Sequence, residues 1–171
     1  KLEAYYPVAI AILDAGLTCS ASLPCPGEMG GSIHINGTGS SIIDTVFVCR
    51  TTGVMQKRWL AETPNEVAEI VEGELDLLRA GNVKPSAGDI RCITYGHLTR
   101  LAIWNLRDIW NKDEPILARL SKVTNWFQAF GGWPVVEQFI DYERTTSKNA
   151  PLFSVQDSVP DYGVDYAEVP F

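Results

Sequence analysis

The sequence predicts an α/β chain in which a helix–strand–strand unit precedes a mainly α-helical region and an extended tail. Within residues 15–50, two strand-like apolar runs flank a loop rich in Gly, Ser and Pro. Four amphipathic segments with helix-capping residues follow. Periodicity is lost from residue 146 onward. We therefore divide the chain into residues 1–52, 53–145 and 146–171.

The first unit opens with an apolar helix over residues 7–15, of the kind that covers a sheet. Gly16 is the expected stop, since glycine adopts the left-handed conformation without a Cβ penalty. A strand over residues 17–23 follows. Pro24 and Pro26 are expected to end this strand, because proline has no N–H to donate to a sheet ladder.

The second strand, residues 42–49, reads IIDTVFVC and is almost continuously apolar. This pattern is typical of a strand buried on both faces. Such a strand needs neighbouring strands and covering helices, and one hairpin with one helix cannot supply them all. The pattern therefore predicts that residues 1–52 are the end of a larger sheet.

The loop between the strands, residues 24–41, is the most suggestive surface feature. A compact domain seldom keeps a loop of this length without a use, so we expect it to fold over a substrate. A plain hairpin connection is the alternative. The loop contains no Lys or Arg and leads into a strand, which argues against a phosphate-binding loop.

Four helices are predicted in the middle region, and their short connections indicate a helical bundle or cap. Thr63 to Glu66 is a complete capping box, and Gly81 ends the helix that it opens. The next helix is expected to pause at Gly96. Three further helix starts are marked by a second cap and by two prolines: Ser86 to Asp89, Pro115 and Pro134.

The composition limits the classes of function. The net charge of -7 argues against a plain nucleic-acid-binding module. However, residues 149–171 hold four acids and no base, which leaves -3 on the other 148 residues, so a local basic groove is compatible with the sequence. The sequence contains no run of 18 apolar residues, so it predicts no membrane-spanning helix. The tail is acidic yet aromatic, and we expect either an arm packed on the body or a partner, or a mobile segment.

No catalytic, cofactor-binding or metal-binding residue can be assigned from motifs. Four cysteines and two histidines occur without zinc-ligand spacing, which favours reduced, mostly buried thiols in a cytoplasmic protein. No G-x-S-x-G surrounds a serine, so a Ser–His–Asp site is not indicated. The candidate contact residues are three polar loop residues and the densest basic cluster, which follows the second strand: Glu28, His34, Asn36, Arg50, Lys57 and Arg58.

The order of features in the first unit resembles a known family. The features are a helix, Gly, a strand ending in Pro, a loop with Glu, a Gly/Ser-rich approach and a strand ending in V-C-R: YYPVAIAILDAGLTCSASLPCPGEMG…GTGSSIIDTVFVCR. This stretch resembles the last portion of the catalytic domain of adenine-specific DNA methyltransferases. The resemblance is to large DNA methylases that carry a domain of unknown function and cluster with phage-defence genes. It covers about 50 residues clearly and about 60 more loosely, through the helix followed by D-I-R-C-I-T-Y-G-H.

The resemblance implies a Rossmann-like sheet in which these strands are the antiparallel terminal pair, with residues 42–49 inserted toward the middle. It also implies S-adenosylmethionine as methyl donor and DNA adenine as acceptor, reached by base flipping. The family's Phe-x-Gly-x-Gly loop and Asp/Asn-Pro-Pro-Tyr/Phe/Trp tetrapeptide are absent from this sequence. We therefore expect a preceding portion or a companion chain to bind the donor and DNA target, and no cofactor for this chain alone.

A second interpretation makes the chain a non-enzymatic helical interaction module. Its acidic aromatic tail would dock a protein partner. An exposed sheet edge would favour strand addition or self-association.

Overall fold

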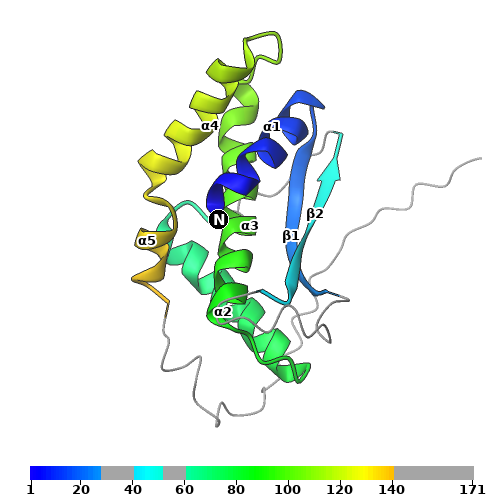
Figure 1. Cartoon of the computed structure of the whole chain (residues 1–171), viewed down its shortest axis with the longest axis vertical. Coiled ribbons are helices and arrows are strands. Elements are labelled where there is room, and N and C mark those ends of the chain that lie inside the picture. Colours follow the sequence, from blue (N-terminus) through cyan, green and yellow to red (C-terminus); the bar gives the residue numbers. More distant parts are fainter. Residues whose placement is uncertain (28–40, 52–60, 141–171) are drawn as a thin grey trace, which may run out of the picture.

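The computed structural model describes residues 1–27, 41–51 and 61–140. These residues form a mostly helical α/β structure with one antiparallel sheet of two strands (Figure 1). The elements are η1 (Leu2–Tyr5), α1 (Tyr6–Asp14), β1 (Thr18–Pro26), β2 (Ile43–Arg50), α2 (Pro64–Ala80), α3 (Ala87–Leu106), η4 (Arg107–Ile109), α4 (Ile116–Phe130) and α5 (Gly132–Glu137). The predicted tail, residues 146–171, lies outside the described part of the chain.

Strand β1 continues through Pro24 and ends at Pro26, so the prediction that it ends before Pro24 is wrong. Pro26 pairs with Ile43, and the next residue, Gly27, donates its N–H to the Ile42 carbonyl at 2.8 Å. Because backbone direction alternates along a strand, the nitrogens of Pro24 and Pro26 face away from β2. Neither proline therefore removes a ladder hydrogen bond.

Helix α3 is the centre of the molecule. It runs along the long axis, with the β1–β2 hairpin on one side and α4 and α5 on the other (Figure 1). The predicted pause at Gly96 is wrong, because α3 is continuous through it. A Cβ atom at Gly96 would collide with Ser22 Oγ and would lie 2.8 Å from Thr45 Cγ2. Glycine at this position therefore permits close packing of the helix on the hairpin.

The predicted helix caps are confirmed. Thr63 and Ser86 each accept a hydrogen bond from the third residue of their helix, and Glu66 and Asp89 complete the two capping boxes. Gly16, with φ of 67°, follows α1 as expected. Pro115 precedes α4.

Helix α5 begins two residues earlier than its proline predicts. Gly131, with φ of 94°, ends α4, and Gly132 directly begins α5. Pro134 then lies in the first turn, where a missing N–H costs no intrahelical bond.

One hydrophobic core joins the hairpin to the helices. It contains side chains from α1, both strands and α2 to α5, among them Leu13, Cys19, Leu75, Ile103 and Phe127. Trp104 Nε1 of α3 donates a buried hydrogen bond of 2.7 Å to the Cys19 carbonyl of β1. The described residues of segments 1–52 and 53–145 thus share their interior.

Within the described residues the second strand is covered on one face only, so its burial on both faces, which the sequence predicts within a larger sheet, stays a prediction. Ile43 is buried, and Phe47 and Cys49 pack against the core. The alternate residues face outward, and Val46 is 44% exposed. The side chains of the apolar run alternate between inward and outward positions. The alternation is not visible in the sequence, because valines occupy outward positions where polar residues are usual.

Candidate functional site

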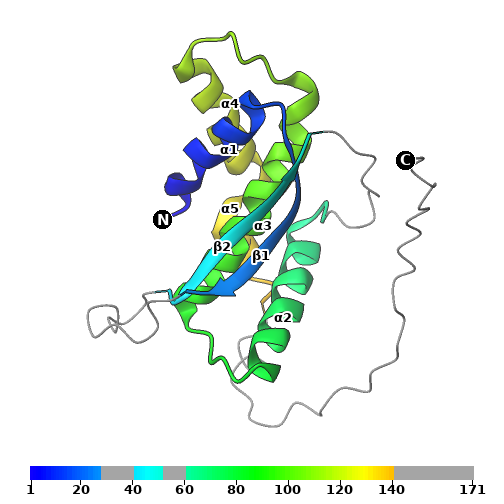
Figure 2. The same ribbon diagram turned by 90° about the vertical axis from the view of Figure 1, so that its right-hand side faces the viewer.

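The outward side of the hairpin is a surface that no described helix covers (Figure 2). In Figure 2 the hairpin lies in front of α3, and no described helix covers the side toward the viewer. The pairs that lie on this side are Ala21 with Val48, Leu23 with Val46, and Cys25 with Asp44. We define the outer hairpin face as the set Ala21, Leu23, Cys25, Asp44, Val46, Val48 and Arg50.

The centre of the outer hairpin face is apolar. Leu23 is 47% exposed, and its cross-strand neighbour Val46 is 44% exposed. The face has charged ends, because Asp44 and Arg50 are both exposed and lie near the two ends of β2. Contiguous apolar residues framed by charge are typical of a surface that takes a partner, whereas single exposed apolar residues are common on any protein.

The backbone of β2 adds an open edge to this face. The pairing with β1 directs the backbone groups of Asp44, Val46 and Val48 toward β1. The intervening residues Thr45, Phe47 and Cys49 direct theirs away from it. Within the ranges that the structure describes, the sheet has two strands and no third strand pairs along this edge. An edge of this kind is a template for another strand.

The start of β2 is fastened by a side chain of α3. The buried Asp89 carboxylate accepts hydrogen bonds from the Ile42 N–H at 2.8 Å and the Ser41 hydroxyl at 2.8 Å. It also accepts from the Ser86 N–H at 2.6 Å. Burial raises the pKa of Asp89, but these hydrogen bonds outweigh it, and the pKa is lowered from its ordinary value of 3.8. A helix cap thus also anchors the start of the strand.

A polar cluster occupies the inner side of the hairpin. Tyr5 Oη lies 3.2 Å from Thr45 Oγ1 and 3.3 Å from Cys92 Sγ, and the Cys92 thiol donates to the Ile43 carbonyl. Burial, with the hydrogen bond to Cys92, raises the pKa of Tyr5 to about 12. A protonated phenol among mutually bonded hydroxyl and thiol groups fastens η1 to β2 and α3. The raised pKa keeps the Tyr5 phenol protonated at neutral pH, so this phenol is not an activated nucleophile.

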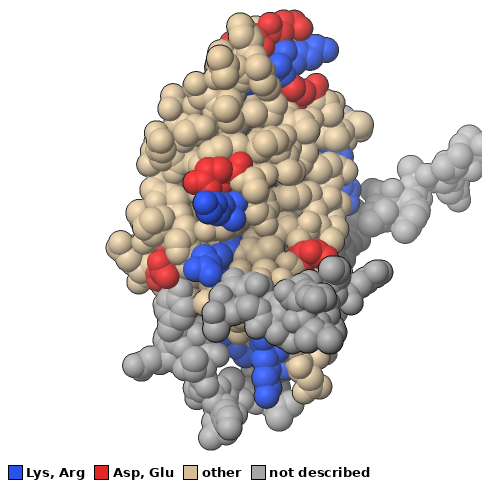
Figure 3. All heavy atoms as spheres, in the orientation of Figure 1, with Lys and Arg blue, Asp and Glu red and all other residues tan. Residues whose placement is uncertain are grey.

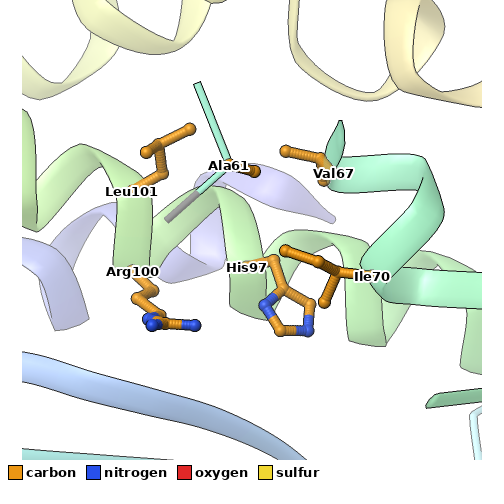
Figure 4. A pocket seen from close by; sticks show the side chains of 6 residues that line it. All are labelled: Ala61, Val67, Ile70, His97, Arg100 and Leu101. Atoms are coloured by element: carbon orange, nitrogen blue, oxygen red, sulfur yellow. The ribbon is translucent and has the colours of Figure 1, made fainter. Parts of the chain in front are cut away.

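His97 takes the structural role that is usual for a buried histidine. Its Nε2 lies 2.9 Å from Glu74 Oε2, which ties α3 to α2. Figure 4 shows His97 and Arg100 pointing the same way from α3 beside a small cavity. The volume of this cavity, about 10 Å³, suits one water molecule and excludes a substrate.

The thiol of Cys19 is equally unsuited to chemistry. The residue is fully buried, and burial raises the pKa of its thiol to about 12. The sequence predicts mostly buried thiols, and this prediction is confirmed for Cys19 alone. Cys49 and Cys92 are half-buried, and Cys25 is exposed. Among the residues described, no group of three or more His, Cys, Asp or Glu side chains could hold a metal ion.

Only one predicted contact residue has a described position. Arg50 is exposed at the end of β2 and belongs to the outer hairpin face. The remaining five lie outside the described residues: Glu28, His34, Asn36, Lys57 and Arg58. On the face shown in Figure 3, the Lys and Arg side chains of described residues are scattered, and some of them lie next to Asp or Glu. That face does not present a continuous basic surface for a phosphate backbone.

Sequence reasoning missed Asp44, Val46 and Leu23 as members of a surface. The signal that could have found them is the even spacing of Asp44 and Arg50, which places both charges on one side of a strand. Since charges point outward, the valines between them had to point outward too.

Comparison with protein-family models, with curated proteins and with solved structures gave no match. Searching the described helices for a segment long and apolar enough to cross a membrane gave none.

Proposed function

We propose that the chain is the terminal part of an S-adenosylmethionine-dependent DNA adenine-N6 methyltransferase. It would supply the last two strands of a Rossmann-like sheet and a helical region that faces DNA or a partner. The observation that supports this most is the hairpin itself, which packs on α3 through one face and leaves an apolar outer hairpin face and an open β2 edge.

A Rossmann-like sheet would account for both features together. Its strands have neighbours on both edges and helices on both faces. In the described residues β2 has one neighbour, β1, and one covering side, formed chiefly by α3. A further strand along the β2 edge would place β2 inside the sheet, as the resemblance implies. A helix over Leu23 and Val46 would bury their exposed side chains.

The proposal divides the work of the enzyme. A preceding portion or companion chain would bind S-adenosylmethionine, which supplies the methyl group, and would hold the target adenine. The loop with Glu28, His34 and Asn36 would border the site of the flipped base. Arg50, with Lys57 and Arg58 after it in the sequence, would contact phosphates of the DNA backbone.

The test is methyl transfer by the product of the complete reading frame that contains these 171 residues. We expect an Asp/Asn-Pro-Pro-aromatic tetrapeptide before Lys1 and transfer of labelled methyl groups to adenine N6 in DNA. We expect the 171-residue chain alone to give no heat of donor binding in calorimetry. Transfer by the chain alone would contradict the division of work. A complete product without the tetrapeptide and without transfer would contradict the proposal.

The role of Arg50 can be tested in the same protein. Arg50→Ala should weaken DNA binding and reduce the salt dependence of binding by about one phosphate contact. Lys57→Ala should add a similar loss. Lys84→Ala, which removes an exposed base just after α2, is the matched control and should leave the binding unchanged. Equal effects of all three substitutions would contradict a local DNA contact.

A non-enzymatic interaction module is the second candidate, and the open β2 edge favours it. Strand addition to such an edge is a common mode of peptide recognition. A monomer whose tail is ordered and contacts nothing outside the chain would argue against this candidate.

A further inference from the structure

The outward residues of β2 form a pattern that is complementary to itself. Asp44, Val46, Val48 and Arg50 alternate along the strand and share the outer hairpin face. The order is therefore acid, apolar, apolar, base. When such a strand meets a reversed copy of itself, each acid faces a base and each valine faces a valine.

An antiparallel pairing of two β2 strands fits this pattern around Phe47. If Phe47 lies opposite the Phe47 of a second copy, then Val46 lies opposite the second copy's Val48, and Asp44 lies opposite its Arg50. The backbone groups directed away from β1, those of Thr45, Phe47 and Cys49, then meet their counterparts in the ladder. The register thus satisfies backbone and side chains together.

The register also gives the outer residues the closest contacts. With Phe47 in a hydrogen-bonded pair, Val46 and Asp44 occupy non-hydrogen-bonded positions. Cα atoms of such pairs approach to about 4.5 Å, where opposite charges and branched side chains interact best. Like charges at the same positions would repel.

We propose that the chain binds a second copy of itself through the β2 edge, so that the two hairpins form one continuous antiparallel sheet. The interface is isologous, because the same residues serve both copies. The area is limited to one strand edge and a few side chains, so the dimer is reversible and forms in the micromolar range or above. The inference is independent of methyl transfer, although a strand from a preceding portion would compete for the same edge.

The experiment is a charge exchange on the 171-residue chain, measured by sedimentation velocity over a concentration series. The wild-type chain should dimerise. In a dimer of the Asp44→Arg variant, each introduced arginine lies opposite Arg50 of the other copy. In a dimer of the Arg50→Asp variant, each introduced aspartate lies opposite Asp44 of the other copy. Each variant alone should raise the dimer dissociation constant roughly tenfold or more.

Mixing the two variants gives the decisive measurement. In the mixed pair, the arginine introduced by Asp44→Arg faces the aspartate introduced by Arg50→Asp, and the native Arg50 of one copy faces the native Asp44 of the other. The mixture should therefore restore dimers. Asp113→Arg and Lys84→Asp change the net charge equally at exposed positions outside the hairpin, and they should dimerise like the wild type.

The outcomes separate clearly. A wild-type chain that stays monomeric at every concentration overturns the proposal. A dimer that survives both reversals, or a mixture that stays monomeric while circular dichroism shows both variants folded, overturns this interface. Methyl transfer is measured on the complete reading-frame product, so failure of one proposal is distinguishable from failure of the other.

Discussion

At the scale of single residues, Asp89 makes two different kinds of contact. As the third residue of α3 it completes a capping box with Ser86, and the same carboxylate fixes Ser41 and Ile42 before β2. The side chain is fully buried, and the cost of burying a charge is offset only because so many donors surround it. These hydrogen bonds fix the start of β2 against α3, and the open edge of β2 begins at this point.

Asp89→Ala should lower the free energy of unfolding by about 3 kcal/mol, because it leaves several buried donors without an acceptor. The folded pKa of Asp89 is depressed, so its stabilisation is complete above the ordinary value of 3.8 and is lost as the pH falls through the lower folded value. Urea unfolding across this range should show a steeper acid loss for the wild type than for the variant. Asp113→Asn, an exposed control, should change neither quantity. An unchanged acid slope in Asp89→Ala would contradict this assignment.

At the scale of elements, the contact between α3 and the hairpin decides how the sheet is presented. The helix passes so close that Gly96 lies against both Ser22 of β1 and Thr45 of β2. This close approach buries the inner side of the hairpin at Ser22, which is 3% exposed. Among the described residues, the two strands therefore present the outer hairpin face and the β2 edge to whatever binds them.

Gly96→Ala should destabilise the protein by about 2 kcal/mol, because the added Cβ would overlap short side chains that the two strands hold in place. Gly73→Ala is the matched control, since Gly73 is an exposed residue of α2 with no neighbouring atom within 4 Å of the position that an added methyl group would take. It should stabilise by about 1 kcal/mol through helix propensity alone. Thermal and urea unfolding measure both. Stabilisation by both substitutions would show that α3 does not depend on this approach.

Local chemistry explains which elements could be predicted from the sequence. The capping boxes at Thr63 and Ser86 and the stop at Gly16 depend on neighbouring residues, and the sequence shows these directly. The continuation of α3 through Gly96 depends on a hairpin about 50 to 75 residues away in the chain, which propensity does not register. Strand β1 can extend through Pro24 because the nitrogen of Pro24 faces away from β2. The direction of this nitrogen follows only from the register of the two strands.

At the scale of the whole molecule, the candidate site was partly predictable. The over-apolar second strand indicated that β2 needs cover on two faces, whereas the described helices cover one and leave Val46 exposed. Arg50 could be chosen from its position after the strand. That Arg50 and Asp44 lie on the same face of the hairpin follows only from the strand pairing in the structure.

The open edge of β2 in the isolated chain is the central claim, and hydrogen exchange of individual amides under dilute, monomeric conditions tests it most directly. The amides of Asp44, Val46 and Val48 should be protected by β1, while those of Thr45, Phe47 and Cys49 should exchange quickly. In the dimer or in the complete reading-frame product, the second set should become protected. Equal protection of both sets in the dilute chain would contradict an open edge.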